Sequence, residues 1–228
     1  MTVERDISLS PLADDNADRL LSRDTLPRAG EWLSALPTLG GAALIDKAKD
    51  WTSFDVVAKL RGITRIKKIG HAGTLDPLAT GLLIVCFGKM TKSIKSFQEQ
   101  TKMYQAVVKL GAVTKTDDAE VPEEHVVPLG DAITLERVEE AAKEFLGVIA
   151  QIPPMYSAIK KNGVPLYKLA RKGQEIEREA RTVEFYRIEV ERFESPYCTL
   201  SVECSKGAYI RALARDIGAR LGVGGYLA

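Results

Sequence analysis

The sequence has few of the residues that build disulfide, metal or membrane structures. It contains only three cysteines, Cys86, Cys198 and Cys204, and none of them has a CxxC or zinc-knuckle spacing. No apolar stretch approaches the ~20 residues of a transmembrane helix, and the N-terminus lacks the basic-then-apolar pattern of a signal peptide. These absences predict buried thiols in a reducing compartment, by default the cytoplasm, and no metal site or membrane association.

Charge of one sign is also lacking overall, because 32 basic residues balance 31 acidic ones and leave a formal net charge of +1. Global charge therefore does not identify a nucleic-acid-binding protein. Basic residues nevertheless gather in four segments, 59–68, 89–95, 160–172 and 206–220. Acidic residues gather in three others, 1–36, 117–124 and 136–144. This segregation is compatible with one basic and one acidic face, and scattered solvated charge is the alternative for any single cluster.

The length of 228 residues allows one large domain, or one domain with a small insert. Residues 1–36 are polar and acidic, which predicts a loosely ordered N-terminal arm with a short helix near 17–23. Residues 37–228 are expected to form the functional domain.

Hydrophobic periodicity and turn residues indicate the elements of that domain. We expect strands at 40–46, 82–87, 104–110, 182–193 and 197–204. We expect helices at 54–61, from Thr91, from Thr134 to Gly147, at 166–172 and at 208–221. Helices and strands alternate irregularly and include hairpins, which predicts an α+β fold with a mixed, mostly antiparallel sheet flanked by helices.

The stretch 70–81, Gly-His-Ala-Gly-Thr-Leu-Asp-Pro-Leu-Ala-Thr-Gly, is the most informative part of the chain. It places a single carboxylate, Asp76, in a loop whose path is restricted by Gly73, Pro77 and Gly81. A basic segment free of acids precedes it and an apolar run follows it. A lone acid beside a basic surface suggests chemistry on a polyanion, and a turn-forming Asp before Pro is the alternative.

This stretch resembles the central motif of the TruB family, the tRNA pseudouridine-55 synthases. The resemblance implies a pseudouridine synthase fold in which Asp76 is the nucleophile that isomerises uridine 55 of the tRNA T loop. The C1′–N1 bond of the uridine breaks, the base rotates, and it rejoins through C5. A carboxylate could attack C1′ or C6, or assist departure of the base, and the sequence does not choose among these. The ionised form is needed in each, and a nearby arginine would favour it.

The segment 205–211, Ser-Lys-Gly-Ala-Tyr-Ile-Arg, resembles the family's SKGTYIR segment. The resemblance implies that Arg211 pairs with the catalytic Asp, that Tyr209 lines the base pocket, and that Lys206 belongs to the substrate-binding residues. The alternative for Arg211 is a first-turn helix residue in solvent.

Tyr104 matches the family's base-stacking tyrosine, which also implies a catalytic role in proton transfer from C5; the alternative is a strand tyrosine at the core edge. His71 matches the histidine that packs into the tRNA T loop, and the alternative is a turn histidine without a role. Gly73 and Thr74 in the same loop are assigned to substrate binding.

Lys47 corresponds to the lysine of the family's first motif and is assigned to the substrate-binding residues. That motif normally reads Lys-Pro-x-Gly, whereas this chain reads Lys47-Ala48-Lys49-Asp50. The departure affects the shape of the turn and leaves the chemistry unchanged.

The segment 152–160 resembles a further family motif, for which we expect a structural and RNA-facing role; a proline-stiffened loop that only packs is the alternative. The resemblance implies the T arm of tRNA as partner, no organic cofactor or metal, and a monomer. The family usually continues beyond Leu227 with an arginine-rich strand and often a C-terminal RNA-binding domain, so the C-terminal end is expected to be truncated. Two alternatives stay open: a guide-RNA-dependent synthase acting on rRNA, and a non-catalytic tRNA-folding chaperone.

Overall fold

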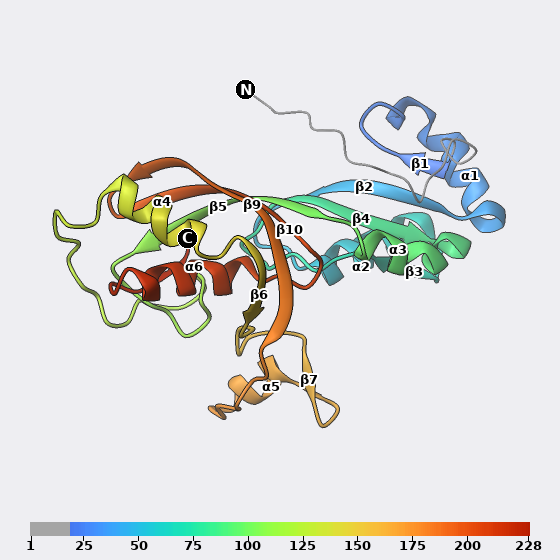
Figure 1. Cartoon of the computed structure of the whole chain (residues 1–228). Helices are drawn as coiled ribbons and strands as arrows, with labels where there is room; N and C mark the ends of the chain where they lie inside the picture. The colour runs from blue at the N-terminus through green and yellow to red at the C-terminus, as the bar shows by residue number, and fades with distance from the viewer. Residues whose placement is uncertain (1–18) are drawn as a thin grey trace. The chain divides into compact units, whose positions relative to one another are not determined.

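The computed structural model describes residues 19–228, and the chain divides into two compact units, residues 1–100 and 101–228 (Figure 1). Residues 1–18, which make up half of the predicted N-terminal arm, lie outside the described residues. Each unit has its own sheet and its own hydrophobic core.

The first unit is built on a four-stranded sheet in the order β1-β2-β4-β3. Only the β1–β2 pair is parallel. The strands are β1 (Leu20–Leu21), β2 (Gly41–Lys47), β3 (Ile69–His71) and β4 (Gly81–Phe87). The helices are η3 (Leu26–Arg28), α1 (Ala29–Leu39), α2 (Ser53–Thr64), η4 (Gly88–Ser93) and α3 (Ile94–Gln98). The near-continuous apolar sequence of β4 is explained by its burial, since all of its residues from Leu83 onward are at least partly covered.

The described part of the N-terminal arm is more ordered than its composition predicts. The helix expected near 17–23 is wrong for the described residues, because Leu20 and Leu21 form a strand that pairs with β2. Trp32 and Leu36, one turn apart on α1, are buried. The Trp32 ring meets Phe87 edge-on at 5.2 Å between centroids. These apolar contacts therefore order part of a segment for which the sequence predicted a loosely ordered arm.

The second unit is built on a five-stranded antiparallel sheet in the order β11-β5-β10-β9-β6. Its strands are β5 (Lys102–Leu110), β6 (Gly147–Gln151), β9 (Arg181–Glu194), β10 (Tyr197–Cys204) and β11 (Gly225–Leu227). Helices α4 (Leu135–Lys143) and α6 (Ile210–Arg220) contribute to its hydrophobic core. These elements place the N-terminus of α6 beside the end of β6, where the candidate site residues of this unit gather.

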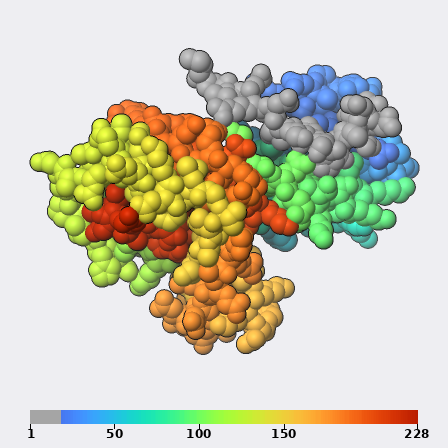
Figure 2. All heavy atoms as spheres, in the orientation of Figure 1, coloured from blue at the N-terminus to red at the C-terminus, as the bar shows by residue number. Residues whose placement is uncertain are grey.

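A small hairpin projects from this sheet. It consists of β7 (Lys160–Lys161), β8 (Val164–Pro165) and α5 (Leu166–Ala170). In the space-filling view it forms a separate lobe below the sheet of its own unit (Figure 2). The segment 152–160, for which we expected an RNA-facing role, leads into this hairpin.

The predicted α+β class with mostly antiparallel sheets is confirmed. The helix expected at 54–61 is α2, which buries Ser53, Val56 and Val57 and leaves Phe54 66% exposed. Thr52 and Asp55 form a reciprocal capping box at its N-terminus, so the helix begins at Ser53. The short strands β3, β6 and β11 were not predicted. Among residues 19–228, no helix is both long enough and apolar enough to cross a bilayer.

We predict that the three thiols are unreactive in the folded protein. Cys86, Cys198 and Cys204 are all buried, and burial raises the pKa of each thiol to about 12. Iodoacetamide at pH 8 should leave the native protein unlabelled and add three groups after unfolding in guanidinium, as counted by intact mass. Labelling of any thiol at equal rates in both states would contradict the structure.

Candidate active site

Asp76 lies on the loop that connects β3 to β4 and is half-buried. Its own carbonyl accepts a hydrogen bond from Ala79 N at 3.1 Å, which closes a turn around Pro77. The following carbonyl, Pro77 O, accepts from Asp50 N at 2.8 Å. The loop that bears the predicted nucleophile is therefore bonded to the segment between β2 and α2.

Lys47 makes a second connection between the Asp76 loop and the segment that follows β2. Its side chain has 0% exposure, and its ammonium donates to the carbonyls of Ala48 (3.0 Å), Trp51 (2.6 Å) and Pro77 (3.2 Å). Burial lowers the pKa of Lys47, and the nearby carboxylates of Asp76 and Asp50 partly offset that effect. Lys47 is predicted from the sequence to be a substrate-binding residue. In the structure its ammonium donates to three backbone carbonyls, an arrangement that holds the loop.

The departure from the family's first motif is accommodated by Asp50. The position where the family has glycine carries Asp50 with φ of 67°, in the left-handed region. Asp tolerates this conformation better than most residues, so the turn that glycine would form is retained. The Asp50 N–H is thereby directed at Pro77 O.

Ser53 braces the other side of Asp76, and the sequence analysis did not identify it. Its hydroxyl accepts from Leu75 N at 3.0 Å and donates to Leu75 O at 3.3 Å. Leu75 and Pro77, the two neighbours of Asp76, are thus both fixed by residues 47–53. The capping signature at Thr52 was the available signal, because it places Ser53 at the first turn of a helix.

The remaining site residues of the first unit lie in this loop or at the end of the strand before it. His71 is half-buried at the end of β3, and its Nδ1 is hydrogen-bonded to the Gly73 carbonyl. In the neutral ring the proton therefore sits on Nδ1, and Nε2 is the acceptor. Thr74 is exposed, so this end of the loop is accessible to a ligand.

In the second unit, Arg211 lies in the first turn of α6 and is only 5% exposed. Its guanidinium donates to Thr116 O at 2.8 Å and to Tyr156 O at 3.0 Å. It also lies 3.4 Å from the Asp118 carboxylate. The alternative of a solvent-exposed first-turn arginine is therefore wrong.

Asp118 is a second residue that the sequence did not single out, since 117–124 was recognised only as an acidic segment. Its Oδ1 accepts from Thr116 Oγ1 at 2.5 Å and from Glu120 N at 3.0 Å. Its carbonyl accepts from Thr114 Oγ1 at 2.6 Å. The available signal was the pair Thr114 and Thr116 just before two acidic residues, because threonine hydroxyls often hydrogen-bond to nearby backbone and carboxylate groups.

Arg215, one turn further along α6, also bonds both an acidic side chain and a backbone carbonyl. It donates to Asp117 Oδ2 at 3.0 Å and to Ile152 O at 2.9 Å. Burial raises the pKa of Asp117, and the positive charges of Arg215 and Arg211 oppose that shift. Arg211 and Arg215 thus fasten α6 both to the 114–118 loop and to the 152–156 segment.

Tyr104 is half-buried on β5 opposite Val202 of β10, and it packs against the same core cluster as Ala208 and Ile210. Tyr209 is the N-cap of α6, and Lys206 is exposed in the turn before it. The predicted site residues therefore form two groups. Asp76, Lys47, His71, Gly73 and Thr74 belong to the first unit, and Arg211, Tyr104, Tyr209 and Lys206 to the second.

Comparison with known proteins identifies the family of the chain. A family profile described as "TruB family pseudouridylate synthase (N terminal domain)" matches residues 61–210. The chain is 47% identical over 191 residues to "tRNA pseudouridine synthase B" of Geobacter sulfurreducens, covering 83% of this chain and 62% of the relative. It is 49% identical over 194 residues to the protein of that name in Parabacteroides distasonis, covering 82% of each. The chain thus spans less than two thirds of the length of the Geobacter relative.

Solved structures give the same fold. A crystal structure of a Cbf5–Nop10–Gar1 complex matches with a TM-score of 0.64 and 30% identity, covering 86% of this chain and 48% of that one. The structure of an H/ACA RNP bound to a substrate RNA containing 2′-deoxyuridine matches with a TM-score of 0.61 and 27% identity, covering 86% and 47%. The α+β sheets of the chain and its match to these structures define a pseudouridine synthase fold. Within that class, the chain belongs to the TruB family.

We predict that the Lys47 clamp stabilises the first unit. Lys47→Met keeps the length of the side chain but leaves three carbonyls without their donor, so the free energy of unfolding should fall by about 2–3 kcal/mol. Lys49→Met, at an exposed position two residues away, is the matched control and should change it by less than about 0.5 kcal/mol. Urea denaturation measures both. Equal effects of the two substitutions would show that the Lys47 bonds contribute nothing.

We also predict energetic coupling between Arg211 and Asp118. A double-mutant cycle of Arg211→Met and Asp118→Asn, followed by urea denaturation, should give an interaction of about 1–2 kcal/mol because the pair is buried. The exposed pair Lys143–Glu139 on α4 is the reference and should give about 0.5 kcal/mol or less. Additive effects of the Arg211 and Asp118 substitutions would exclude a direct interaction.

Proposed function

We propose that this chain isomerises uridine 55 in the T loop of tRNA to pseudouridine. One observation carries the proposal: Asp76, in the motif of the family, lies on a loop whose neighbouring residues on both sides are hydrogen-bonded to the buried residues Lys47 and Ser53. Relatives that are 47–49% identical are named tRNA pseudouridine synthase B, which supports tRNA as the substrate.

The proposed reaction is an isomerisation whose atoms balance without a co-reactant. The C1′–N1 bond breaks, a C1′–C5 bond forms, C5 loses its proton, and N1 gains one. Asp76 acts as an ionised carboxylate, at C1′ or at C6 or by assisting departure of the base. Arg211 favours the ionised form by its positive charge. Residues 37–228 act together as the catalytic domain.

The uridine must leave its stack to reach the carboxylate, at a cost of a few kcal/mol. We propose that stacking on Tyr104 offsets this cost, since base–aromatic stacking contributes ~1–3 kcal/mol, and that Tyr104 also takes part in removing the C5 proton. Tyr209 lines the base pocket. His71, with Gly73 and Thr74, occupies the place in the T loop that the flipped nucleotide leaves.

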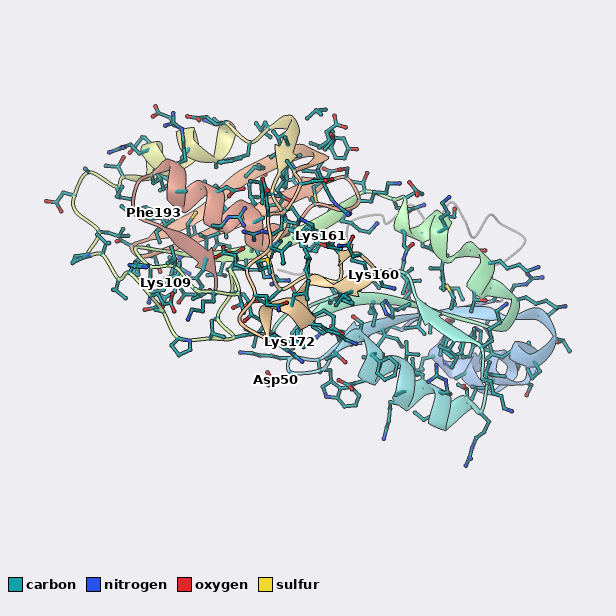
Figure 3. All side chains as sticks on the ribbon, turned by 90° about the horizontal axis from the view of Figure 1, so that it is seen from below. Asp50, Lys109, Lys160, Lys161, Lys172 and Phe193 are labelled. Carbon is teal, nitrogen blue, oxygen red and sulfur yellow. The ribbon has the colours of Figure 1, made fainter. Side chains whose placement is uncertain are left out.

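The basic segments are proposed to bind phosphates of the T arm, with the chain acting as a monomer. Lys206 belongs to one of them, and Lys160, Lys161 and Lys172 belong to the projecting hairpin of the second unit and its continuation (Figure 3). Phosphate binding by lysine releases counterions, so tRNA affinity should fall with salt. The loop is recognised by shape, because A-form grooves hide the base edges.

Two other functions are alternatives to this proposal. A guide-RNA-dependent synthase is less supported, because the Cbf5 complexes are 27–30% identical whereas the tRNA-modifying relatives are 47–49% identical. A tRNA-folding chaperone without catalysis is the second candidate, since the binding surfaces require no reaction.

We predict that Asp76→Asn abolishes pseudouridine formation and leaves tRNA binding within about threefold of wild type, because the amide keeps the shape and loses the anion. Carbodiimide labelling and primer extension on an unmodified tRNA transcript measure the product, which has the same mass as uridine. A stop at the T-loop uridine with wild type alone supports the proposal. Salt-sensitive binding without a stop for either protein would favour the chaperone.

A further inference from the structure

Gln151, the last residue of β6, makes an unusual pair of hydrogen bonds. Its side chain is 2% exposed. Its Nε2 donates to Tyr209 O at 3.1 Å, and its Oε1 accepts from Tyr209 N at 2.9 Å. One carboxamide thus satisfies both backbone groups of a residue 58 positions away in the sequence.

The bonded residue is the N-cap of α6. Tyr209 has an extended backbone, with φ of −106° and ψ of 113°, and the helix has no side-chain cap of its own. Tyr209 O also accepts the first helical bond, from Leu213 N at 3.1 Å. A helix start without a capping side chain leaves backbone donors to be satisfied from elsewhere, and here Gln151 supplies that partner. Its side chain therefore fixes where α6 begins.

The start of α6 is where the site residues of the second unit lie. Tyr209 is itself assigned to the base pocket, and Arg211 follows two residues later with its guanidinium already held by Thr116 and Tyr156 carbonyls. A rotation of the Tyr209 backbone would redirect the Tyr209 ring and shift the base of the Arg211 side chain. The turn before it contains Gly207 with φ of 82°, so the preceding chain does not restrain Tyr209 by sterics alone.

We propose that Gln151 is a positioning residue for the isomerisation: it sets the backbone of Tyr209 and thereby the orientation of Tyr209 and Arg211, without touching the substrate. The inference rests on the proposed function and names a residue that the sequence motifs did not single out. Only a side chain with a donor and an acceptor side by side can bond both backbone groups, which glutamine does and glutamate in its ionised form does not.

Two substitutions separate the bonds. Gln151→Met keeps the length and removes both, which leaves the Tyr209 N–H without the carboxamide. Gln151→Glu keeps an acceptor for that N–H and turns a second anionic oxygen toward Tyr209 O. Gln105→Met is the matched control, because Gln105 is exposed on β5 of the same unit and bonds only the Glu191 carboxylate among the bonds described.

The measurements are the single-turnover rate at saturating tRNA, the tRNA dissociation constant, and amide hydrogen exchange. Both Gln151 variants should lose about 10- to 100-fold in rate with binding within about threefold, and Gln105→Met should match wild type. Exchange at the Tyr209 amide should accelerate in Gln151→Met and stay slow in Gln151→Glu. Protection in β9 and β10 should be unchanged in both variants, which separates positioning from loss of structure.

Three results would overturn the inference: an unchanged rate in folded Gln151→Met, a rate loss matched by an equal loss of tRNA binding, or faster exchange throughout β9 and β10. A wild-type chain that forms no pseudouridine would overturn the proposed function and this inference with it. An active wild type with an unaffected Gln151→Met variant would overturn this inference alone.

Discussion

The whole site depends on one constraint: backbone N–H and C=O groups in loops have no ladder partners, yet when buried they must be hydrogen-bonded. In the first unit the ammonium of Lys47 satisfies three carbonyls at once, and the hydroxyl of Ser53 satisfies both groups of Leu75. These bonds fix the backbone on either side of Asp76, and Asp76 itself is only half-buried. The loop is thus held in place while part of the Asp76 surface stays exposed.

The second unit solves the same problem with arginine and carboxamide groups. Arg211 and Arg215 donate to carbonyls of two different loops and lie beside Asp118 and Asp117. A guanidinium suits this task because its donors point in fixed, divergent directions. A buried guanidinium without a carboxylate would be costly, and for this reason the acids of the 114–118 loop accompany the two arginines. The same ion pairs therefore balance the charge of the two arginines and fix the shape of the 114–118 loop.

Local sequence patterns predicted the helices and strands well, but they did not predict the long-range hydrogen bonds that hold the loops. Neighbouring residues suffice to predict the apolar strand β4, the periodic helix α4 and the β9–β10 hairpin. The motif around Asp76 could be recognised for the same reason, because it is a continuous stretch of sequence. The bonds from Lys47 to Pro77 and from Arg211 to Thr116 join residues 30 and 95 positions apart. No local pattern indicates such pairs, and residue type misleads, since lysine and arginine are usually exposed. The order of α1 escaped prediction because two buried residues, Trp32 and Leu36, outweigh a polar composition.

The segment 47–50, which corresponds to the family's first motif, shows that different residues can form the same turn. The chain has neither the proline nor the glycine that the family's motif carries, yet Asp50 takes the left-handed conformation and gives its N–H to Pro77 O. Lys47 Nζ donates to the same carbonyl. What the loop requires is two donors at one place, and any residue that accepts a positive φ can supply the second. Holding Asp50 in that conformation costs free energy. The hydrogen bonds of the buried Lys47 ammonium to the same turn offset this cost.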